Sequence, residues 1–345
     1  ENFRDDEKPG LKLSSQEWLL MQLQNAGRAD SRDAAKTLLA SMSLGDVREF
    51  MYSRTPEQML EGITGGAGMY RAPQSFRDGT VLPKLTLHQV FRTPGDYSAI
   101  PLMTGTNRDE AKLFLAQDPE QVRLLFGFLP RLRDPDAYNR TAAYYSDNWK
   151  AQAVDETINV IINNSAKPVY AYRWDWDEGG KNLLVDYSEL LGAGHGLEVP
   201  YLFHDFEGSI TAPGLYNDKN IPGRDALAAQ MRSYWAEFAH SGSPGRGRKG
   251  DLPEWERWTT SRPNLMLLDT EAGGGLRMVK EPMTVAMLKK RIAEDPHLPD
   301  QQSRCALHAE LFLHANSGDD VWDEDEYLAL GCEEYDPWTV EHRRD

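Results

Sequence analysis

The segment Val169-Tyr-Ala-Tyr-Arg-Trp-Asp-Trp176 indicates how this chain is expected to fold. Its apolar and aromatic residues alternate in character, which predicts a β-strand. Two more strands are predicted over Tyr97–Gly105 and Asn264–Asp269. Helical patterns separate them, a long one over 147–163 and an amphipathic one over 224–241. Strands that alternate with helices indicate an α/β fold with a mostly parallel sheet.

The number of predicted helices exceeds what three strands can cover. Residues 14–67 are predicted to be helical, and Thr55-Pro56 opens one helix with proline at its first position. Asp118-Pro119 and Asp134-Pro135 predict two further helix starts. Three strands cannot bury the apolar faces of so many helices, so we expect part of the sheet to be missing.

The composition excludes several classes of function. The chain has 345 residues, 38 basic and 54 acidic, and a net charge of −16. Nucleic acid is not expected as a main partner, because phosphate binding needs a positive surface. No apolar stretch approaches the roughly 18–20 residues that cross a bilayer, so no membrane span is predicted. Residues 1–8 lack an initiator methionine and a signal-peptide pattern, so the chain is expected to begin inside a longer protein.

Only two cysteines occur, Cys305 and Cys332, both in the polar C-terminal region. Their spacing matches no zinc or thioredoxin-type pattern. A disulfide between them would close a loop of about 28 residues and stabilise it by roughly 3–4 kcal/mol. The alternative is two buried free thiols that behave as small apolar residues. Because disulfides form in oxidising compartments, a secreted or periplasmic location is expected.

Two loops hold side chains that could perform chemistry. Glu110 lies in the loop after the first strand, Gly105-Thr-Asn-Arg-Asp-Glu110, and His195 lies after the second, in Gly192-Ala-Gly-His-Gly-Leu-Glu198. Loops at the carboxyl ends of parallel strands face one side of a sheet, so the two side chains can meet. The carboxylate would then accept the Nδ1–H, leaving Nε2 to take a proton from a nucleophile. Two alternatives stay open: a structural histidine, and a glutamate in a helix's first turn.

No nucleophile accompanies this pair in the sequence. The motif Gly-x-Ser-x-Gly does not occur, and its nearest approach, Ser41–Gly45, lacks the first glycine and lies between predicted helices. No His-Gly-Gly segment of the oxyanion-hole type occurs. Neither cysteine has neighbours that suggest a reactive thiolate. The sequence therefore supplies an acid and a base without the group that they would activate.

Four segments, taken in order, carry a further pattern: Phe76–Pro83, Ile100–Glu110, Gly192–Phe203, and Met231–Pro244 with 253–255 and 266–269. They resemble the type-B carboxylesterase family, the cholinesterase-like branch of the α/β-hydrolases. The C-terminal tail is similar to a para-nitrobenzyl-esterase-type extension. The resemblance covers about residues 15–280.

The resemblance implies an α/β-hydrolase fold, of which this chain is the C-terminal portion of a mostly parallel sheet with helical insertions. Residues 1–290 would belong to one carboxylesterase domain, and 291–345 would be an extension packed on it. Glu110 and His195 match the family's triad acid and base. Leu113 and Phe114 stand where the family places pocket-lining side chains; the alternative is two core residues of a helix's first turn.

The function implied by the resemblance is hydrolysis of small-molecule carboxylic esters by a Ser-Glu-His mechanism, without metal or cofactor. In this fold the serine precedes the acid and the histidine along the chain. We therefore expect the serine and the oxyanion hole to come from an N-terminal part of the same enzyme, and this chain to be inactive alone. The alternative is a catalytically silent, cholinesterase-like interaction module, which the missing serine favours and the intact Glu110 and His195 disfavour.

Overall fold

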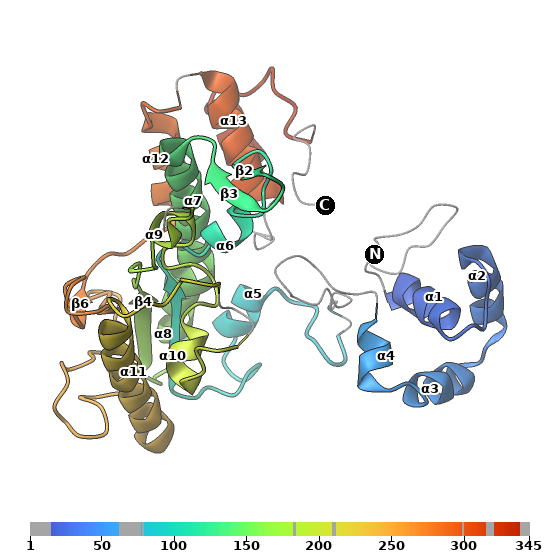
Figure 1. Cartoon of the computed structure of the whole chain (residues 1–345), viewed down its shortest axis with the longest axis horizontal. Coiled ribbons are helices and arrows are strands. Elements are labelled where there is room, and N and C mark those ends of the chain that lie inside the picture. Colours follow the sequence, from blue (N-terminus) through green and yellow to red (C-terminus); the bar gives the residue numbers. More distant parts are fainter. Residues whose placement is uncertain are drawn as a thin grey trace. The chain divides into compact units, whose positions relative to one another are not determined.

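The computed structural model describes residues 15–61, 77, 79–181, 184–208, 212–298, 300–314 and 321–338. The chain divides into two compact units, residues 1–84 and 85–345 (Figure 1). The division predicted at residue 290 concerns the C-terminal extension and stays a prediction.

The first unit is helical. Leu20, Leu23, Ala35 and Phe50 form its buried core. Its last helix begins as predicted, since the Thr55 side chain accepts a hydrogen bond from the Gln58 N–H at a helix whose first residue is Pro56. The predicted helical character is confirmed over 15–61, and 62–67 lie outside the described residues. The helices are α1 (Ser15–Asn25), α2 (Arg32–Ser41), α3 (Leu44–Tyr52) and α4 (Pro56–Leu60).

The second unit is built on a four-stranded sheet of order β1-β4-β5-β6. β1, β4 and β5 run parallel, with Leu102 opposite Val169 and Ala171 opposite Leu265, and β6 pairs antiparallel to β5. The three predicted strands and the fold class, a mostly parallel α/β sheet with helical insertions, are confirmed. In the described part of the chain β1 has a neighbour on one side only. The strands are β1 (Leu102–Asn107), β4 (Val169–Trp174), β5 (Leu265–Leu268) and β6 (Arg277–Val279).

Alternate residues of β4 face two separate cores, as the period of a strand requires. Tyr170 and Trp174 pack with Met231 and Tyr234 of α11 (Ile221–Ser241). Val169 and Ala171 pack in the other core, with Ile158 and its neighbours. Helices thus cover both faces of the sheet, which explains why its strands read as nearly continuous apolar runs.

The predicted helix over 147–163 is part of a longer helical run. α7 (Pro135–Trp149) continues into the π-helix η2 (Lys150–Glu156) and then α8 (Thr157–Asn164). Lys150 donates to Asp155 over 2.5 Å inside η2, and both side chains are buried. The other helices of this unit are α5 (Leu87–Arg92), α6 (Lys112–Leu115), α9 (Tyr187–Leu190), α10 (Val199–Phe203), α12 (Val285–Glu294), α13 (Gln301–Ala309), η3 (Glu310–His314) and α14 (Glu324–Ala329).

One predicted helix start is wrong. Asp134 caps α7 as expected, with its carboxylate accepting from the Ala137 N–H. Asp118-Pro119 opens no helix and instead leads through a turn into a hairpin of β2 (Val122–Leu125) and β3 (Leu129–Leu132). Val122 and Leu129 are buried, and this tertiary packing overrides the local helix signal.

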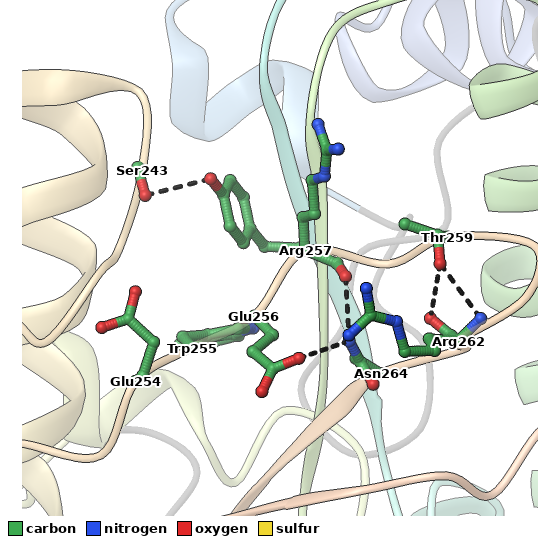
Figure 2. A pocket seen from close by; sticks show the side chains of 9 residues that line it. Ser243, Glu254, Trp255, Glu256, Arg257, Thr259, Arg262 and Asn264 are labelled. Carbon is green, nitrogen blue, oxygen red and sulfur yellow. Dashed lines mark hydrogen bonds between the residues drawn. The ribbon is translucent and has the colours of Figure 1, made fainter.

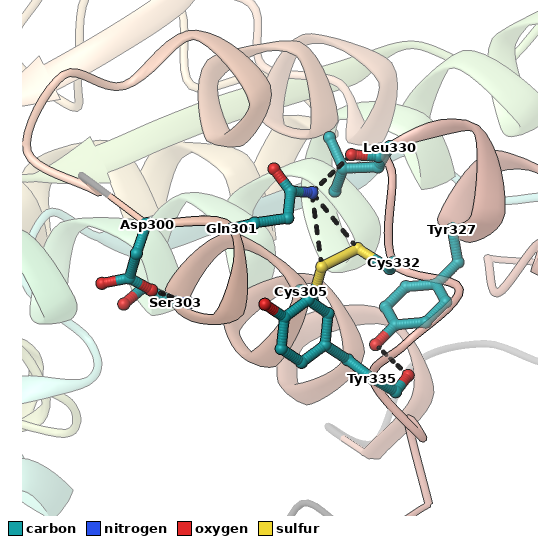
Figure 3. The surroundings of a disulfide bond; sticks show 8 residues. All are labelled: Asp300, Gln301, Ser303, Cys305, Tyr327, Leu330, Cys332 and Tyr335. Atoms are coloured by element: carbon teal, nitrogen blue, oxygen red, sulfur yellow. Dashed lines mark hydrogen bonds between the residues drawn. A yellow bond between two sulfur atoms is a disulfide. The ribbon is translucent and has the colours of Figure 1, made fainter.

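Cys305 and Cys332 form a disulfide, which confirms the first of the two alternatives for these residues. The bond joins α13 to the segment that follows α14 (Figure 3). Both cysteines are buried with Ala309 and Tyr327 in a small apolar cluster. Within the described residues, no helix combines the length and the apolar character needed to cross a membrane.

Candidate active site

Glu110 and His195 meet at the carboxyl ends of the parallel strands. Glu110 follows β1 by three residues, and His195 lies in the loop before α10. The Glu110 Oε2 atom is 2.6 Å from His195 Nδ1, a hydrogen-bond distance. The sequence-based expectation that these two loops approach each other is therefore met in the geometry. Nε2 of His195 has no hydrogen-bond partner among the described residues.

The Glu110 carboxylate is fixed from its other side. Its Oε1 atom accepts hydrogen bonds from Thr106 Oγ1 at 3.0 Å and from the Asn107 N–H at 2.8 Å. The Glu110 side chain is 7% exposed, whereas that of His195 is 36% exposed. A buried, fully hydrogen-bonded carboxylate thus orients an imidazole whose far edge reaches solvent.

The loop that carries His195 is tied to the loop that carries Glu110. The Asp109 N–H donates to the Ala193 carbonyl, and the Ala193 N–H donates to the Asp109 carboxylate, both at 3.0 Å. Gly192 has a φ of 49°, and a Cβ there would lie 2.5 Å from Asp109 Oδ2. Only glycine fits this close approach, so the glycine-rich sequence around His195 has a direct structural cause.

A second carboxylate, Glu198, belongs to the site and was missed from the sequence. Asn107 Nδ2 donates to Glu198 Oε2 at 2.5 Å and to the Gly194 carbonyl at 2.9 Å. Burial raises the pKa of Glu198, and the charge of Glu110 raises it further. Its position three residues after His195, at the start of a helix, was the available signal.

The surroundings favour the protonated form of His195. The hydrogen bond that His195 donates to the Glu110 carboxylate raises the pKa of His195 above its usual 6.5, and the charges of Glu110 and Glu198 act in the same direction. Burial opposes them. Both carboxylates therefore favour the imidazolium form of His195.

Two aromatic rings lie beside the imidazole of His195. The Trp149 and Phe114 ring centroids lie 4.9 Å and 5.5 Å from the imidazole centroid. The two rings stack on each other at 6.4 Å. The structure thus brings Phe114, named from the sequence, against His195; Leu113 is partly buried beside it. Trp149, at the end of α7, was not predicted.

A pocket of about 280 Å³ lies elsewhere in this unit (Figure 2). Tyr170 and Asn264, which line it, stand at the amino ends of β4 and β5, away from the carboxyl ends that carry the pair. Tyr170 Oη donates to Ser243 Oγ, and Asn264 Nδ2 donates to Glu256, both at 3.0 Å. This pocket is separate from the Glu110–His195 site.

A mostly parallel sheet with a carboxylate–imidazole pair beyond its strands defines an architecture of the α/β-hydrolase type. Residues 133–286 match the carboxylesterase family. Over this region the chain is similar to the carboxylesterases, the family that its motifs resemble.

The chain is also similar to individual proteins over part of their length. Carboxylesterase 4A of Bos taurus is 34% identical over 119 residues, which are 34% of this chain and 19% of that protein. The cocaine esterase of Homo sapiens is 23% identical over 318 residues, 83% of this chain and 52% of that protein. The solved structure of Aspergillus niger EstA aligns with a TM-score of 0.48 and 17% identity, covering 78% of this chain and 53% of its own. This chain spans about half or less of the length of these proteins.

Proposed function

We propose that this chain supplies the acid and the base of a carboxylic-ester hydrolase that works by a Ser-Glu-His mechanism. The observation that carries the proposal is the 2.6 Å contact between Glu110 and His195 Nδ1, with Nε2 left available. The relationship to carboxylesterases supports ester hydrolysis as the reaction class. The substrate would be a small-molecule ester.

In the proposed reaction His195 Nε2 takes the proton of a serine hydroxyl while the serine oxygen attacks the ester carbonyl carbon. Glu110 holds the resulting imidazolium through Nδ1–H. Collapse of the tetrahedral intermediate breaks the bond to the alcohol, which receives the proton from Nε2. Water then attacks the acyl-serine by the same proton transfers, releasing the acid. Backbone N–H groups would hold the oxyanion.

The serine is proposed to come from polypeptide outside these 345 residues, because the sequence contains no Gly-x-Ser-x-Gly. In the described part of the chain, the side of β1 away from β4 pairs with no strand, and it offers this polypeptide a place. A strand added in parallel beside β1 would end at the same sheet edge, next to the loop that carries Glu110. Whether that polypeptide is a separate chain or part of the same one, the expected neighbour is an N-terminal carboxylesterase segment. The disulfide supports a secreted or periplasmic location.

The proposal is tested by co-expressing this chain with the N-terminal segment of a carboxylesterase that carries Gly-x-Ser-x-Gly. The complex should hydrolyse p-nitrophenyl esters of short acids, and His195→Ala should lower kcat by at least 10³-fold. Asp218→Asn, at an exposed residue, is the matched control and should retain activity.

Two results would overturn the proposal: a folded complex without hydrolysis, or full activity in His195→Ala. The first would favour a catalytically silent interaction module. The chain alone should not react with a fluorophosphonate probe, and labelling of it would reveal a nucleophile within the 345 residues.

A further inference from the structure

The hairpin β2–β3 exposes an apolar tip. Leu124, Phe126 and Phe128 are 60%, 87% and 72% exposed. Large apolar side chains that gather on a surface mark an interaction site more often than isolated ones do. This tip is therefore a candidate contact surface, distinct from the Glu110–His195 pair.

The backbone at the tip adopts a conformation that is unfavourable for its residue. Phe126 has a φ of 55°, in the left-handed region that glycine and asparagine usually occupy. Gly127 beside it has a φ of 81°, which glycine adopts freely. The turn thus holds an aromatic side chain outward at a position where a bulky residue is disfavoured. Strain of this kind clusters at functional sites.

Two arginines lie on the hairpin strands between the tip and the base, and neither is paired with an acidic side chain of the described residues. Arg123 and Arg131 are directly opposite each other in the hairpin register, and both are exposed. Neither forms an ion pair with another described residue. Like charges at directly opposed positions destabilise a hairpin. The segment 121–133 contains three arginines and no acidic residue, although the whole chain carries a net charge of −16.

The base of the hairpin is fixed to the body of the second unit. Val122 and Leu129 are buried with Tyr138, Val185 and Leu190. Tyr138 Oη donates to the Leu190 carbonyl at 2.6 Å, which holds the cluster together. The base of the hairpin is therefore anchored to the second unit, and this anchoring fixes the positions of the apolar and basic residues nearer the tip.

We propose that this hairpin docks on an anionic lipid surface. Phe126 and Phe128 enter the interface between headgroups and acyl chains, and Arg123 and Arg131 contact the phosphates. Arg123 and Phe126 are three positions apart along the chain, which corresponds to roughly 10 Å at the rise of a β-strand. That height matches the 5–10 Å depth to which interfacial apolar side chains enter a membrane. The flanking acids Glu120 and Asp134 stand at the base, away from the tip.

The charge pattern favours lipid over the other occupants of an apolar surface. Two copies that met tip to tip about a two-fold axis would bring two arginine pairs together. Nucleic acid would be repelled by the acidic remainder of the chain over a larger contact. A lipid surface contacts the tip and the arginines, and salt screens the charges that lie more than about 10 Å from that surface.

The test is sedimentation of the full 345-residue chain with vesicles of phosphatidylcholine, alone or mixed with phosphatidylserine. Binding is expected to the mixed vesicles, and about 0.5 M salt should weaken it. Phe126→Ser with Phe128→Ser should weaken binding at least tenfold, and Arg123→Gln with Arg131→Gln about tenfold. Leu44→Ser and Arg92→Gln change exposed residues elsewhere and are the matched controls.

Circular dichroism checks that each variant is folded, which is expected because the changed side chains are exposed. The proposal is overturned if the parent chain does not bind, if the serine variants bind like the parent, or if phosphatidylserine makes no difference. It is also overturned if the serine variants convert a dimer into a monomer without any vesicle binding, since the tip would then join two copies. Sedimentation requires no turnover, so the outcome is independent of ester hydrolysis.

Discussion

Glu110 Oε2 and His195 Nδ1 lie 2.6 Å apart, although the two residues are 85 positions apart in the sequence. β1 and β4 are adjacent and parallel, so the loops that follow them emerge at one edge of the sheet. Two hydrogen bonds between Asp109 and Ala193, one to the Ala193 carbonyl and one to the Asp109 carboxylate, then hold the two segments together. The contact is thus a consequence of the sheet order and of these hydrogen bonds.

This contact predicts how His195 titrates. Its pKa should lie above 6.5 in the isolated chain, and Glu110→Gln should lower it, because the hydrogen bond and the charge that favour the imidazolium are removed. Since the folded pKa is raised, the pair's stabilisation is complete below pH 6.5 and is lost as the pH rises through the folded pKa. Histidine NMR titration measures both effects. An unchanged His195 titration in Glu110→Gln would contradict the prediction.

Trp149 is expected to affect both the imidazolium and the substrate. Its ring is 4.9 Å from that of His195, and a π-face favours a nearby cation. Trp149→Ala should therefore lower the pKa of His195, while Trp149→Phe should keep most of the effect. In the reconstituted esterase, Trp149→Ala should raise KM for aryl esters more than it lowers kcat. Equal titrations of the alanine and phenylalanine variants would show that the ring has no influence.

Because of the buried carboxyl group of Asp269, we expect the free energy of unfolding to fall as the pH rises. It is buried directly after β5, where it accepts a hydrogen bond from the Thr270 N–H at 2.8 Å. Burial raises the pKa of Asp269 to about 6, and Asp175 and Asp177 contribute repulsion. The native state therefore holds a proton that the unfolded chain releases, and stability decreases between about pH 4 and pH 6.

Replacing this carboxylate should stabilise the protein at neutral pH. Asp269→Asn should raise the free energy of unfolding at pH 7 by about 1–3 kcal/mol and leave it nearly unchanged at pH 4. Urea denaturation at the two pH values measures the difference. Asp218→Asn, at an exposed residue, is the control and should change neither value. Destabilisation of Asp269→Asn at pH 7 would refute the prediction.

The buried His308 should make the protein less stable as the pH falls. It is buried against Phe312, Trp322 and Tyr327, and its Nδ1 has no hydrogen-bond partner among the described residues. Burial, together with the nearby charge of Lys289, lowers the pKa of His308 to about 4. Because the folded pKa is depressed, stability is complete above pH 6.5 and is lost as the pH falls towards 4, on the order of 3 kcal/mol in total.

His308→Phe should remove that acid sensitivity, since phenylalanine fits an aromatic cluster and does not titrate. Thermal unfolding at pH 7 and pH 4.5 should then differ less than in the parent chain. His240→Gln changes an exposed histidine and should retain the parent's pH dependence. The explanation fails if His308→Phe loses as much stability at pH 4.5 as the parent.

The parts of the fold that follow from local pattern were predictable. β4 and β5 are apolar runs that alternate with helical segments, and this alternation indicated a parallel sheet. The β2–β3 hairpin was missed because Asp118-Pro119 resembles a helix start and the turn at Phe126-Gly127 lacks the usual hairpin signals. β6 is three residues long and exists only through its pairing with β5.

The candidate site, like the fold, could be predicted only where local sequence pattern determines it. Glu110 and His195 could be paired from the rule that loops after parallel strands share an edge. Trp149 could not, because its approach to His195 depends on where α7 passes into η2, a change of helix type without a sequence signal. Glu198 could not be placed either, because it accepts a hydrogen bond from Asn107, which is 91 positions away in the sequence.

The bond between Cys305 and Cys332 has a practical consequence for anyone preparing this protein. A host that folds the chain in a reducing cytosol, or a buffer that contains a thiol reductant, yields a molecule whose segment after α14 is no longer covalently held to α13. Samples made that way and samples exported to an oxidising compartment are chemically different species. Measurements on this chain should therefore begin with a mass determination that distinguishes the two.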